Sequence, residues 1–271
     1  MQEGGWGCAG RRAVGFCESI IVSYDLCMQT RPDRDPKLAV AAFYSQWDGE
    51  RTYVNPRTVV RTLQQRRVPP DACILDMGFG NGEIALAVAQ AFAQGRVEGL
   101  DLTQRNVDLA RAKAKARGVA NVRFWMEDVE AWEPVPARYG AVIAMQVMQF
   151  IADPDALIRR VFRSLQPGGT FLFATPFLPA PQQLHAFFLD AYARVVPNSF
   201  QYRTEDAWYG SLFDAGFERI YTAKAHWDPK TQPPGWRWAY GQALADHGLD
   251  AEIARRHTWG GLISARKPAN G

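Results

Sequence analysis

Several features that define specialised classes of protein are missing from this 271-residue chain. Its four cysteines form no C-x-x-C pair and lie near no histidine cluster, which argues against a metal site or a disulfide framework. No run reaches the ~20 apolar residues that a membrane-spanning helix needs, and the first residues lack a signal peptide's charged and apolar regions. We therefore expect a reduced, cytoplasmic protein with no metal and no membrane partner.

An excess of charge of one sign is missing as well. The 31 basic and 28 acidic residues give a formal net charge of +3, and the basic residues are spread along the chain instead of being gathered in runs. A nucleic-acid groove needs a local concentration of positive charge, so no nucleic-acid partner is expected. With 47% hydrophobic residues, the chain can bury one large core, or one core and a smaller cap.

The most informative feature that is present is a glycine-rich run at residues 74–82, with the sequence ILDMGFGNG. Its apolar start predicts a buried parallel strand, and its glycines permit a tight turn in which the backbone approaches a ligand. An Ala-rich helix is expected to follow over residues 83–92, with its N-terminus pointing at that ligand. A second apolar run ends at Asp101, nineteen residues after Gly82. This combination predicts a site for a nucleotide-like ligand.

The spacing of the glycines distinguishes between two kinds of nucleotide site. A dinucleotide fingerprint has the form G-x-G-x-x-G, whereas this chain has G-x-G-x-G, with Glu83 where the third fingerprint glycine would stand. A carboxylate aimed at a pyrophosphate would repel it. We therefore expect neither NAD nor FAD.

The order of several sequence blocks resembles the class I S-adenosylmethionine (SAM) dependent methyltransferases of the small-molecule type. The resemblance covers roughly residues 70–176, with a weaker echo to the end of the chain. It implies a Rossmann-like fold, SAM as the cofactor and a role in small-molecule biosynthesis. The matching blocks are Asp76 with the glycine run, VEGLDL at 97–102, FWMEDV at 124–129, residues 139–150, and LQPGGT at 165–170.

From residue 71 onward, strand and helix periods alternate, which predicts an α/β fold with a doubly wound, mostly parallel, seven-stranded sheet and an antiparallel last strand. Strands are expected near residues 72–76, 96–101, 121–125, 140–145, 169–175, 217–225 and 259–266. Helices are expected near residues 82–94, 104–117, 154–165 and 184–196, between an N-cap at Thr204 and a C′ residue at Gly216, and once or twice within residues 226–257.

Additional elements are expected around this sheet. Residues 1–36 are interrupted by prolines and predict a flexible tail, in which Met28 offers an alternative start. Residues 37–70 predict a helical cap with helices over 37–47 and 56–67. Residues 71–271 would then form the SAM-binding domain, and a homodimer is one assembly open to it. Cap insertions are expected near residues 176–203 and 226–257.

The resemblance implies roles for residues at the carboxyl ends of the first two strands, where an open α/β sheet binds its ligand. Backbone at Gly78, Gly80 and Gly82 would contact the amino-acid part of SAM, with the helix end favouring its carboxylate. Asp101 can accept both ribose hydroxyls at once. The alternative for Asp101 is an N-cap for the helix that begins near Gln104.

Further cofactor contacts are implied by the blocks after the second strand. Asp128 would meet the adenine amino group and the Val129 amide a ring nitrogen, although Asp128 as a solvated loop carboxylate stays open. Asp76 is expected to hold the glycine loop or to reach the cofactor's ammonium through water. The other residues expected around the cofactor are Leu102, Asn106, Trp125, Met145 and Gln146.

The acceptor site is encoded less strongly, because in-line displacement at SAM needs alignment more than it needs a base. The family often has a histidine where this chain has Gln149-Phe150, so a histidine base at that point is in doubt. His185 is the best candidate for a general base, since histidine exchanges protons near neutral pH, and a surface or core histidine is its alternative. Aromatic candidates favour a flat or apolar acceptor, although each can simply pack its helix. The substrate-binding candidates are Tyr44, Trp47, Tyr53, Gln149, Phe150 and Phe177.

Three functions are compatible with these patterns. The first is methyl transfer to N, O or C of a small aromatic or apolar metabolite. The second is a SAM-dependent enzyme in which methylation is coupled to, or replaced by, cyclisation or elimination. The third is a macromolecule methyltransferase or a noncatalytic SAM-binding partner. No Asn-Pro-Pro-aromatic or Asp-Pro-Pro-aromatic signature follows the fourth strand, which argues against nucleobase methylation, and the intact glycine run argues against a degenerate binder.

Overall fold

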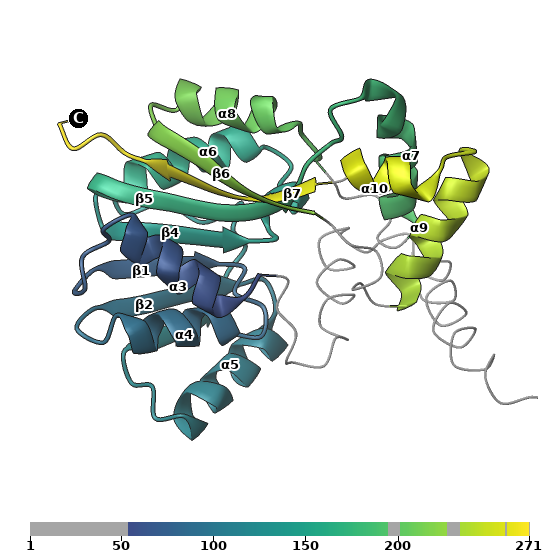
Figure 1. Cartoon of the computed structure of the whole chain (residues 1–271). Coiled ribbons are helices and arrows are strands. Elements are labelled where there is room, and N and C mark those ends of the chain that lie inside the picture. Colours follow the sequence, from purple (N-terminus) through teal and green to yellow (C-terminus); the bar gives the residue numbers. More distant parts are fainter. Residues whose placement is uncertain (1–53, 195–200, 227–233, 258, 271) are drawn as a thin grey trace, which may run out of the picture.

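The fold is built on a seven-stranded sheet in the order β3-β2-β1-β4-β5-β7-β6 (Figure 1). The computed structural model describes residues 54–194, 201–226, 234–257 and 259–270. β7 pairs antiparallel with β5 and β6, and every other pair is parallel, so the predicted sheet is confirmed. The strands are β1 (Cys73–Met77), β2 (Arg96–Asp101), β3 (Val122–Met126), β4 (Tyr139–Met145), β5 (Leu165–Pro176), β6 (Glu218–His226) and β7 (Trp259–Arg266).

The helices begin and end close to the expected residues where local signals are strong. Thr204 caps α8 by accepting a hydrogen bond from the Ala207 amide at 3.2 Å, and Gly216 follows the helix with a φ of +97°. The helices are α3 (Pro56–Gln65), α4 (Glu83–Ala91), α5 (Gln104–Ala116), α6 (Pro154–Ser164), α7 (His185–Ala193), α8 (Glu205–Asp214), α9 (Pro234–Asp246) and α10 (Ala251–His257), with 3-10 turns η1 (Met148–Phe150) and η2 (Gln182–Leu184).

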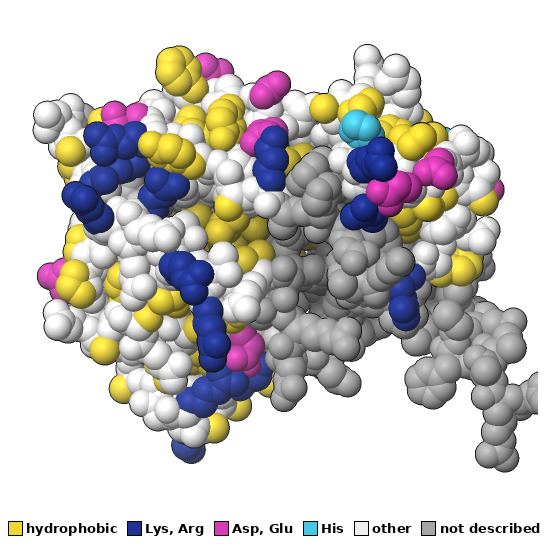
Figure 2. All heavy atoms as spheres, in the orientation of Figure 1, with side chains coloured by type: hydrophobic (Ala, Val, Ile, Leu, Met, Phe, Trp, Pro, Cys, Tyr) yellow, Lys and Arg dark blue, Asp and Glu magenta, His cyan; other side chains and the backbone are white. Residues whose placement is uncertain are grey.

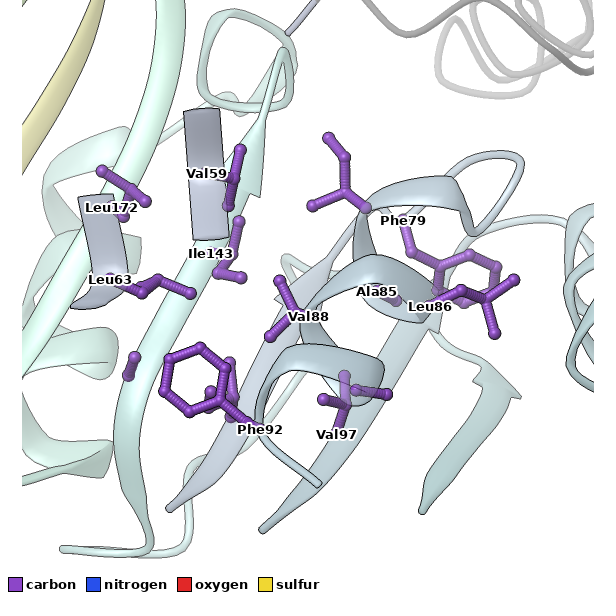
Figure 3. Close-up of a cluster of buried hydrophobic side chains, with 14 of the residues drawn as sticks. Val59, Leu63, Phe79, Ala85, Leu86, Val88, Phe92, Val97, Ile143 and Leu172 are labelled. Carbon is purple, nitrogen blue, oxygen red and sulfur yellow. The ribbon is translucent and has the colours of Figure 1, made fainter. Parts of the chain in front are cut away.

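One face of the sheet is covered by α3, α4 and α5. Val59 and Leu63, four residues apart on α3, are fully buried and lie over the sheet near Ile143 and Leu172 (Figure 3). Each such buried aliphatic side chain contributes roughly 1.5–3 kcal/mol. α3 therefore belongs to the helical layer on the sheet, although its residues were expected to form a cap. The helix predicted over residues 37–47 and the tail lie outside the described residues.

The opposite face of the sheet is covered by α6 and α8. Leu157 and Val161 of α6 are fully buried there, and Trp208 of α8 is packed edge-on against Phe173 of β5 at 5.4 Å between ring centroids. With both faces covered, the central strands are buried on two sides. This explains their continuous apolar sequences.

A separate group of helices forms a third cluster beside the sheet. α7 follows β5, whereas α9 and α10 come from the insertion between β6 and β7, and Figure 1 shows the three helices together. We call this cluster the aromatic cap. Its buried residues are Phe187, Phe188, Ala191, Tyr192, Tyr202, Ala239, Tyr240, Ala243 and Ala254.

The start of β5 differs from the prediction of a turn followed by a strand at residues 169–175. β5 already begins at Leu165, which pairs with Tyr139, and the next pair joins Thr170 to Ala141. The extra residues between these pairs form an irregularity within the strand, in which Gly168 has a φ of +76°. The Pro-Gly-Gly sequence thus interrupts the pairing of a strand that has already started.

The surface of the described residues shows two further features. In Figure 2 the Lys and Arg side chains on the visible face form several separate groups over the sheet half and the cap. Among the described residues, no helix combines the length and the apolar character needed to cross a membrane. In the same residues, His, Cys, Asp and Glu side chains nowhere gather in a group that could hold a metal ion.

Candidate cofactor and acceptor site

The loop between β1 and α4 is held to the end of β2. Gly78, Gly80 and Gly82 have φ values of +63°, +56° and +78°, which residues other than glycine rarely adopt. The Gly78 amide donates to the Leu100 carbonyl at 2.8 Å, and the Gly80 amide donates to Oδ2 of Asp101 at 2.9 Å. The conformation of the loop therefore depends on β2.

The three glycines of this loop differ in what lies beside them. A Cβ at Gly78 would lie 2.5 Å from Cγ2 of Val147, and a Cβ at Gly82 would lie 2.7 Å from Cβ of Ala110. A Cβ at Gly80 would meet no atom of the described residues within 4 Å. Two glycines thus allow close packing of the protein on itself, whereas Gly80 presents its backbone to open space.

Asp101 is a buried acceptor at the carboxyl end of β2, with 6% of its surface exposed. Its Oδ1 accepts hydrogen bonds from the amide of Thr103 at 3.0 Å, from Oγ1 of Thr103 at 3.1 Å and from Nδ2 of Asn106 at 3.0 Å. Burial raises the pKa of this carboxyl, against the lowering effect of these donors. Thr103, and not Asp101, is the N-cap of α5.

Asp76 lies on β1 and carries the most unusual carboxylate of the site. Its Oδ2 is buried and has no hydrogen-bond partner among the described residues. Burial, with a contribution from the charge of Asp101, raises the pKa of Asp76 to about 8. Because Leu100 and Asp101 accept the hydrogen bonds of Gly78 and Gly80, Oδ2 of Asp76 is not engaged with the glycine loop and is left to meet a donor from outside the described residues.

The segment after β3 forms a turn around Asp128. Oδ1 of Asp128 accepts from the Glu130 amide at 2.9 Å, and its backbone carbonyl accepts from the amides of Ala131 and Trp132. Asp128 is half-buried, and the side chain of Val129 is packed in the cluster between the sheet and helices α6 and α8. The carboxylate therefore shapes the turn that presents the Val129 amide.

Glu83 does not point a free charge at the ligand, so the repulsion argument against a dinucleotide was wrong in its mechanism. Its carboxylate pairs with Nζ of Lys113 at 2.8 Å and with Nη1 of Arg117 at 2.7 Å, both on α5. Burial alone would raise the pKa of Glu83, but the hydrogen bonds from Arg117 and Lys113 lower it. The residue joins α4 to α5.

The segment after β4 lies between the glycine loop and the aromatic cap. Val147 borders Gly78, and Phe150 packs against the aromatic cap. Gln146 has a φ of +60°, and its Oε1 accepts from Nε2 of Gln149 at 3.2 Å. The backbone carbonyl of Gln149 accepts from the amide of Gln201 at 2.7 Å. One short segment therefore links the two halves of the site.

The other expected site residues are placed as follows. Phe177 is buried, and its ring leaves no room for a Cβ at Gly261. It therefore packs on β7, in the cluster between the sheet and helices α6 and α8. His185 is the first residue of α7, and its Nε2 lies 2.7 Å from the Pro179 carbonyl. Met145 is packed against the cluster under α3 and α4, and Leu102 is half-buried. Three acceptor candidates, Tyr44, Trp47 and Tyr53, lie outside the described residues.

Comparison with known proteins agrees with this geometry. Residues 74–169 match a family model described as a methyltransferase domain. The ubiquinone biosynthesis O-methyltransferase of Serratia proteamaculans is 33% identical over 135 residues, covering 48% of this chain and 55% of that protein. Residues 74–169 of the chain are therefore similar in sequence to methyltransferase domains.

Solved structures share this fold at low sequence identity. Haemonchus contortus phosphoethanolamine N-methyltransferase 2, solved with S-adenosylhomocysteine, matches with a TM-score of 0.63 and 18% identity, covering 88% of this chain and 58% of that chain. The [4+2]-cyclase SpnF matches with a TM-score of 0.61 and 21% identity, covering 92% and 95%. The chain spans about half the length of the curated relatives it matches.

The residues around the glycine loop fit S-adenosylmethionine as a cofactor. Among the described residues, nothing lies within 4 Å of a Cβ at Gly80, and Gly82 supplies no side chain to cap α4. The Glu83 amide donates to Oδ1 of Asn81 at 3.1 Å, so the next amides of the first turn are the ones that suit the cofactor's carboxylate. Oδ2 of Asp76 is a buried oxygen without a hydrogen-bond partner in the described part of the chain, and it suits the cofactor's ammonium. The backbone donors at the start of α4 and the acceptor on Asp76 thus match the carboxylate and the ammonium of a zwitterionic amino acid.

Two residues that shape the site were not anticipated from the sequence. Thr103 caps α5 and donates twice to Asp101, and a threonine just before a helical pattern is a usable signal for this role. Val147 sets the approach of the segment after β4 to Gly78. No sequence pattern predicts that contact, because it joins two loops far apart in the chain.

Proposed function

We propose that this protein transfers the methyl group of SAM to an oxygen, nitrogen or carbon atom of a small organic acceptor with an aromatic or otherwise apolar skeleton. One observation carries the proposal: the segment after β4 borders the glycine loop through Val147 and the aromatic cap through Phe150. An acceptor held against that segment would lie between the cofactor loop and a cluster rich in aromatic side chains.

The chain's own residues would act mainly by binding and alignment. When bound, SAM supplies a methyl group on a sulfonium that is already a good leaving group, so little further activation is needed. Without the cofactor Asp76 is protonated at neutral pH; the cofactor's ammonium would favour its ionised form, and Oδ2 would then pair with that ammonium. Oδ2 of Asp101 carries one bond, from Gly80, and can accept a ribose hydroxyl, whereas Oδ1 already has three donors. Binding both hydroxyls at once would displace Thr103 Oγ1 or the Asn106 amide.

The adenine would lie beside the turn after β3. Asp128 and the Val129 amide are proposed to meet its amino group and a ring nitrogen, as the family resemblance implies. The turn is held by the Asp128 carboxylate and carbonyl, which fix the direction of the Val129 amide.

A general base is needed only for acceptors that arrive protonated. His185 is proposed for that role, and the contact of its Nε2 with the Pro179 carbonyl places the proton on Nε2 and leaves Nδ1 to accept. His185→Phe should then slow turnover far more than it weakens cofactor binding. Equal turnover in the variant and the wild type would remove His185 from the mechanism.

The proposed function is tested by incubating the protein with methyl-labelled SAM and a metabolite extract, then identifying labelled products by mass spectrometry. A labelled small molecule that is missing from the reaction of Asp101→Ala supports the proposal. Label in protein or nucleic acid would favour a macromolecule substrate. A metabolite that is rearranged without gaining label would favour cyclisation or elimination, and either result would contradict the proposal.

A further inference from the structure

The Gln149 side chain is a buried polar group whose hydrogen bonding is incomplete. Only 2% of the residue is exposed, and its Oε1 has no hydrogen-bond partner among the described residues. Its Nε2 donates to Oε1 of Gln146 at 3.2 Å. A buried carbonyl oxygen that has lost its water is disfavoured unless it meets a donor. The orphaned oxygen therefore points to a ligand donor.

The position of Gln149 connects this oxygen with the acceptor and not with the sheet. Gln149 follows Val147, which borders the glycine loop, and precedes Phe150, which packs on the aromatic cap. Its own carbonyl accepts from the Gln201 amide at 2.7 Å, so its backbone is fixed from the cap side. The side chain is thus held where the proposed cofactor and acceptor regions meet.

The amide is also oriented by its neighbour. Gln146 follows the last residue of β4 and has a φ of +60°. Its backbone N–H donates to the Ala174 carbonyl of β5 at 2.9 Å. Strained backbone of this kind persists where the surrounding structure holds it, and it gathers at functional sites. Because Gln146 presents its Oε1 to Nε2 of Gln149, the side-chain nitrogen has a partner and the oxygen is the end of the amide left for a ligand donor.

We propose that Oε1 of Gln149 accepts a hydrogen bond from an O–H or N–H group of the acceptor, which makes the protein selective for substrates with such a donor at the site. The inference rests on the proposed function. An amide oxygen is too weak a base to take the proton, so Gln149 binds and orients the donor and does not deprotonate it. A methylated product that has lost its donor would leave the oxygen unpaired, and it would bind less tightly than the substrate.

The test uses small aromatic probes in matched pairs, namely catechol with 1,2-dimethoxybenzene and aniline with N,N-dimethylaniline. Binding is measured by saturation-transfer NMR with and without S-adenosylhomocysteine, and S-adenosylhomocysteine binding itself is measured by calorimetry. In the wild type, each donor probe should bind at least tenfold more tightly than its methylated partner. In Gln149→Met, which keeps the length of the side chain, that ratio should fall to about one while S-adenosylhomocysteine affinity stays within twofold.

A matched control is Gln201→Met, because Gln201 is exposed and its hydrogen bond to Gln149 is made by its backbone amide, which the substitution keeps. Its probe ratios should equal those of the wild type. Equal binding of both probes to the wild type, or an unchanged ratio in Gln149→Met, would overturn the inference. So would a tenfold loss of S-adenosylhomocysteine affinity in Gln149→Met with unchanged ratios, since the oxygen would then serve the cofactor. Failure of S-adenosylhomocysteine to bind the wild type would remove the proposed function, while the ratios measured without it would still test Gln149.

Discussion

Oδ2 of Asp101 accepts a hydrogen bond from the amide of Gly80 at 2.9 Å, which ties the last residue of β2 to the middle of the glycine loop. The same carboxylate orients Thr103 and Asn106 at the start of α5. One buried acidic residue therefore sets the relative position of the two loops that would bind SAM. Loss of its charge should disturb the loop and the binding site together.

Replacement of Asp101 by alanine should weaken S-adenosylhomocysteine binding at least tenfold, because charged hydrogen bonds of this type are worth about 1.5–3 kcal/mol. Calorimetry measures the affinity, and hydrogen exchange should show a less protected Gly80 amide in the variant. Asp108→Asn, at an exposed carboxylate on α5, is the control and should match the wild type. Unchanged affinity in Asp101→Ala would show that the ribose contact is wrongly assigned.

Two glycine substitutions should separate stability from ligand binding. A Cβ at Gly80 would meet no atom of the described residues within 4 Å, so Gly80→Ala should be destabilised by its positive φ alone, and the free energy of unfolding should fall by about 1–2 kcal/mol. Gly82→Ala should lose a further ~1–3 kcal/mol, because its Cβ would lie 2.7 Å from that of Ala110.

Gly80→Ala should be the more stable of the two variants but should bind S-adenosylhomocysteine more weakly than Gly82→Ala. The new methyl group of Gly80→Ala occupies the open space beside the loop, so S-adenosylhomocysteine binding should weaken although the fold is nearly intact. Denaturant unfolding and calorimetry on both variants provide the comparison. If Gly80→Ala binds as well as the wild type, the space beside Gly80 is not part of the cofactor site.

The raised pKa of Asp76 predicts a pH dependence of stability. Its folded pKa is about 8, whereas an unfolded aspartate titrates near ~3.9, so between these values the folded state holds a proton that the unfolded state has lost. Stability therefore falls as pH rises through this window, by at most ~1.4 kcal/mol per pH unit from this group.

Asp76→Asn removes this contribution, so its stability relative to the wild type should improve steadily from pH 5 to pH 8. Denaturant unfolding at several pH values measures the difference, and Asp71→Asn, at an exposed carboxylate nearby in the sequence, serves as the reference. Parallel curves for Asp76→Asn and the wild type would contradict the assignment of a buried, protonated Asp76.

The aromatic cap should loosen independently of the sheet. Phe188 is 1% exposed and lies 4.6 Å from Tyr192 and 5.0 Å from Tyr202 between ring centroids, so Phe188→Ala should cost the cap about 3–5 kcal/mol. Hydrogen exchange should accelerate in α7 and α9 but not in α4. Turnover should fall while S-adenosylhomocysteine affinity is retained.

The control for the cap is Leu189→Ala on the same helix, where the side chain is 44% exposed. It should change stability by less than ~0.5 kcal/mol. Equal acceleration of exchange in α4 and α7 by Phe188→Ala would mean that cap and sheet unfold as one unit.

Much of the fold could be predicted because its signals are local. Thr204 and Gly216 mark the ends of α8 through their own hydrogen bonds and φ angle, and the buried strands have continuous apolar sequences. The Pro-Gly-Gly sequence misled the prediction for β5, because a β-irregularity and a turn use the same residues. α3 was placed in a cap because its amphipathic pattern does not say which surface it covers.

The cofactor half of the candidate site was more predictable than the acceptor half. The glycine spacing and Asp101 belong to recognisable blocks, and the structure brings them together at the ends of β1 and β2. Phe177 and Gln149 have no such blocks. The structure buries Phe177 against Gly261 and leaves Oε1 of Gln149 without a hydrogen-bond partner among the described residues, and neither outcome follows from residue type.

The sequence by itself determined the positive-φ glycine loop, the amphipathic helices and the alternation that requires a parallel sheet, since each depends on residues close together in the chain. Only the tertiary structure decided that Asp101 would hold Gly80, that Val147 would touch Gly78 and that Glu83 would pair with α5. Those contacts join segments separated by many residues, and they form only when the whole sheet and its helices pack together.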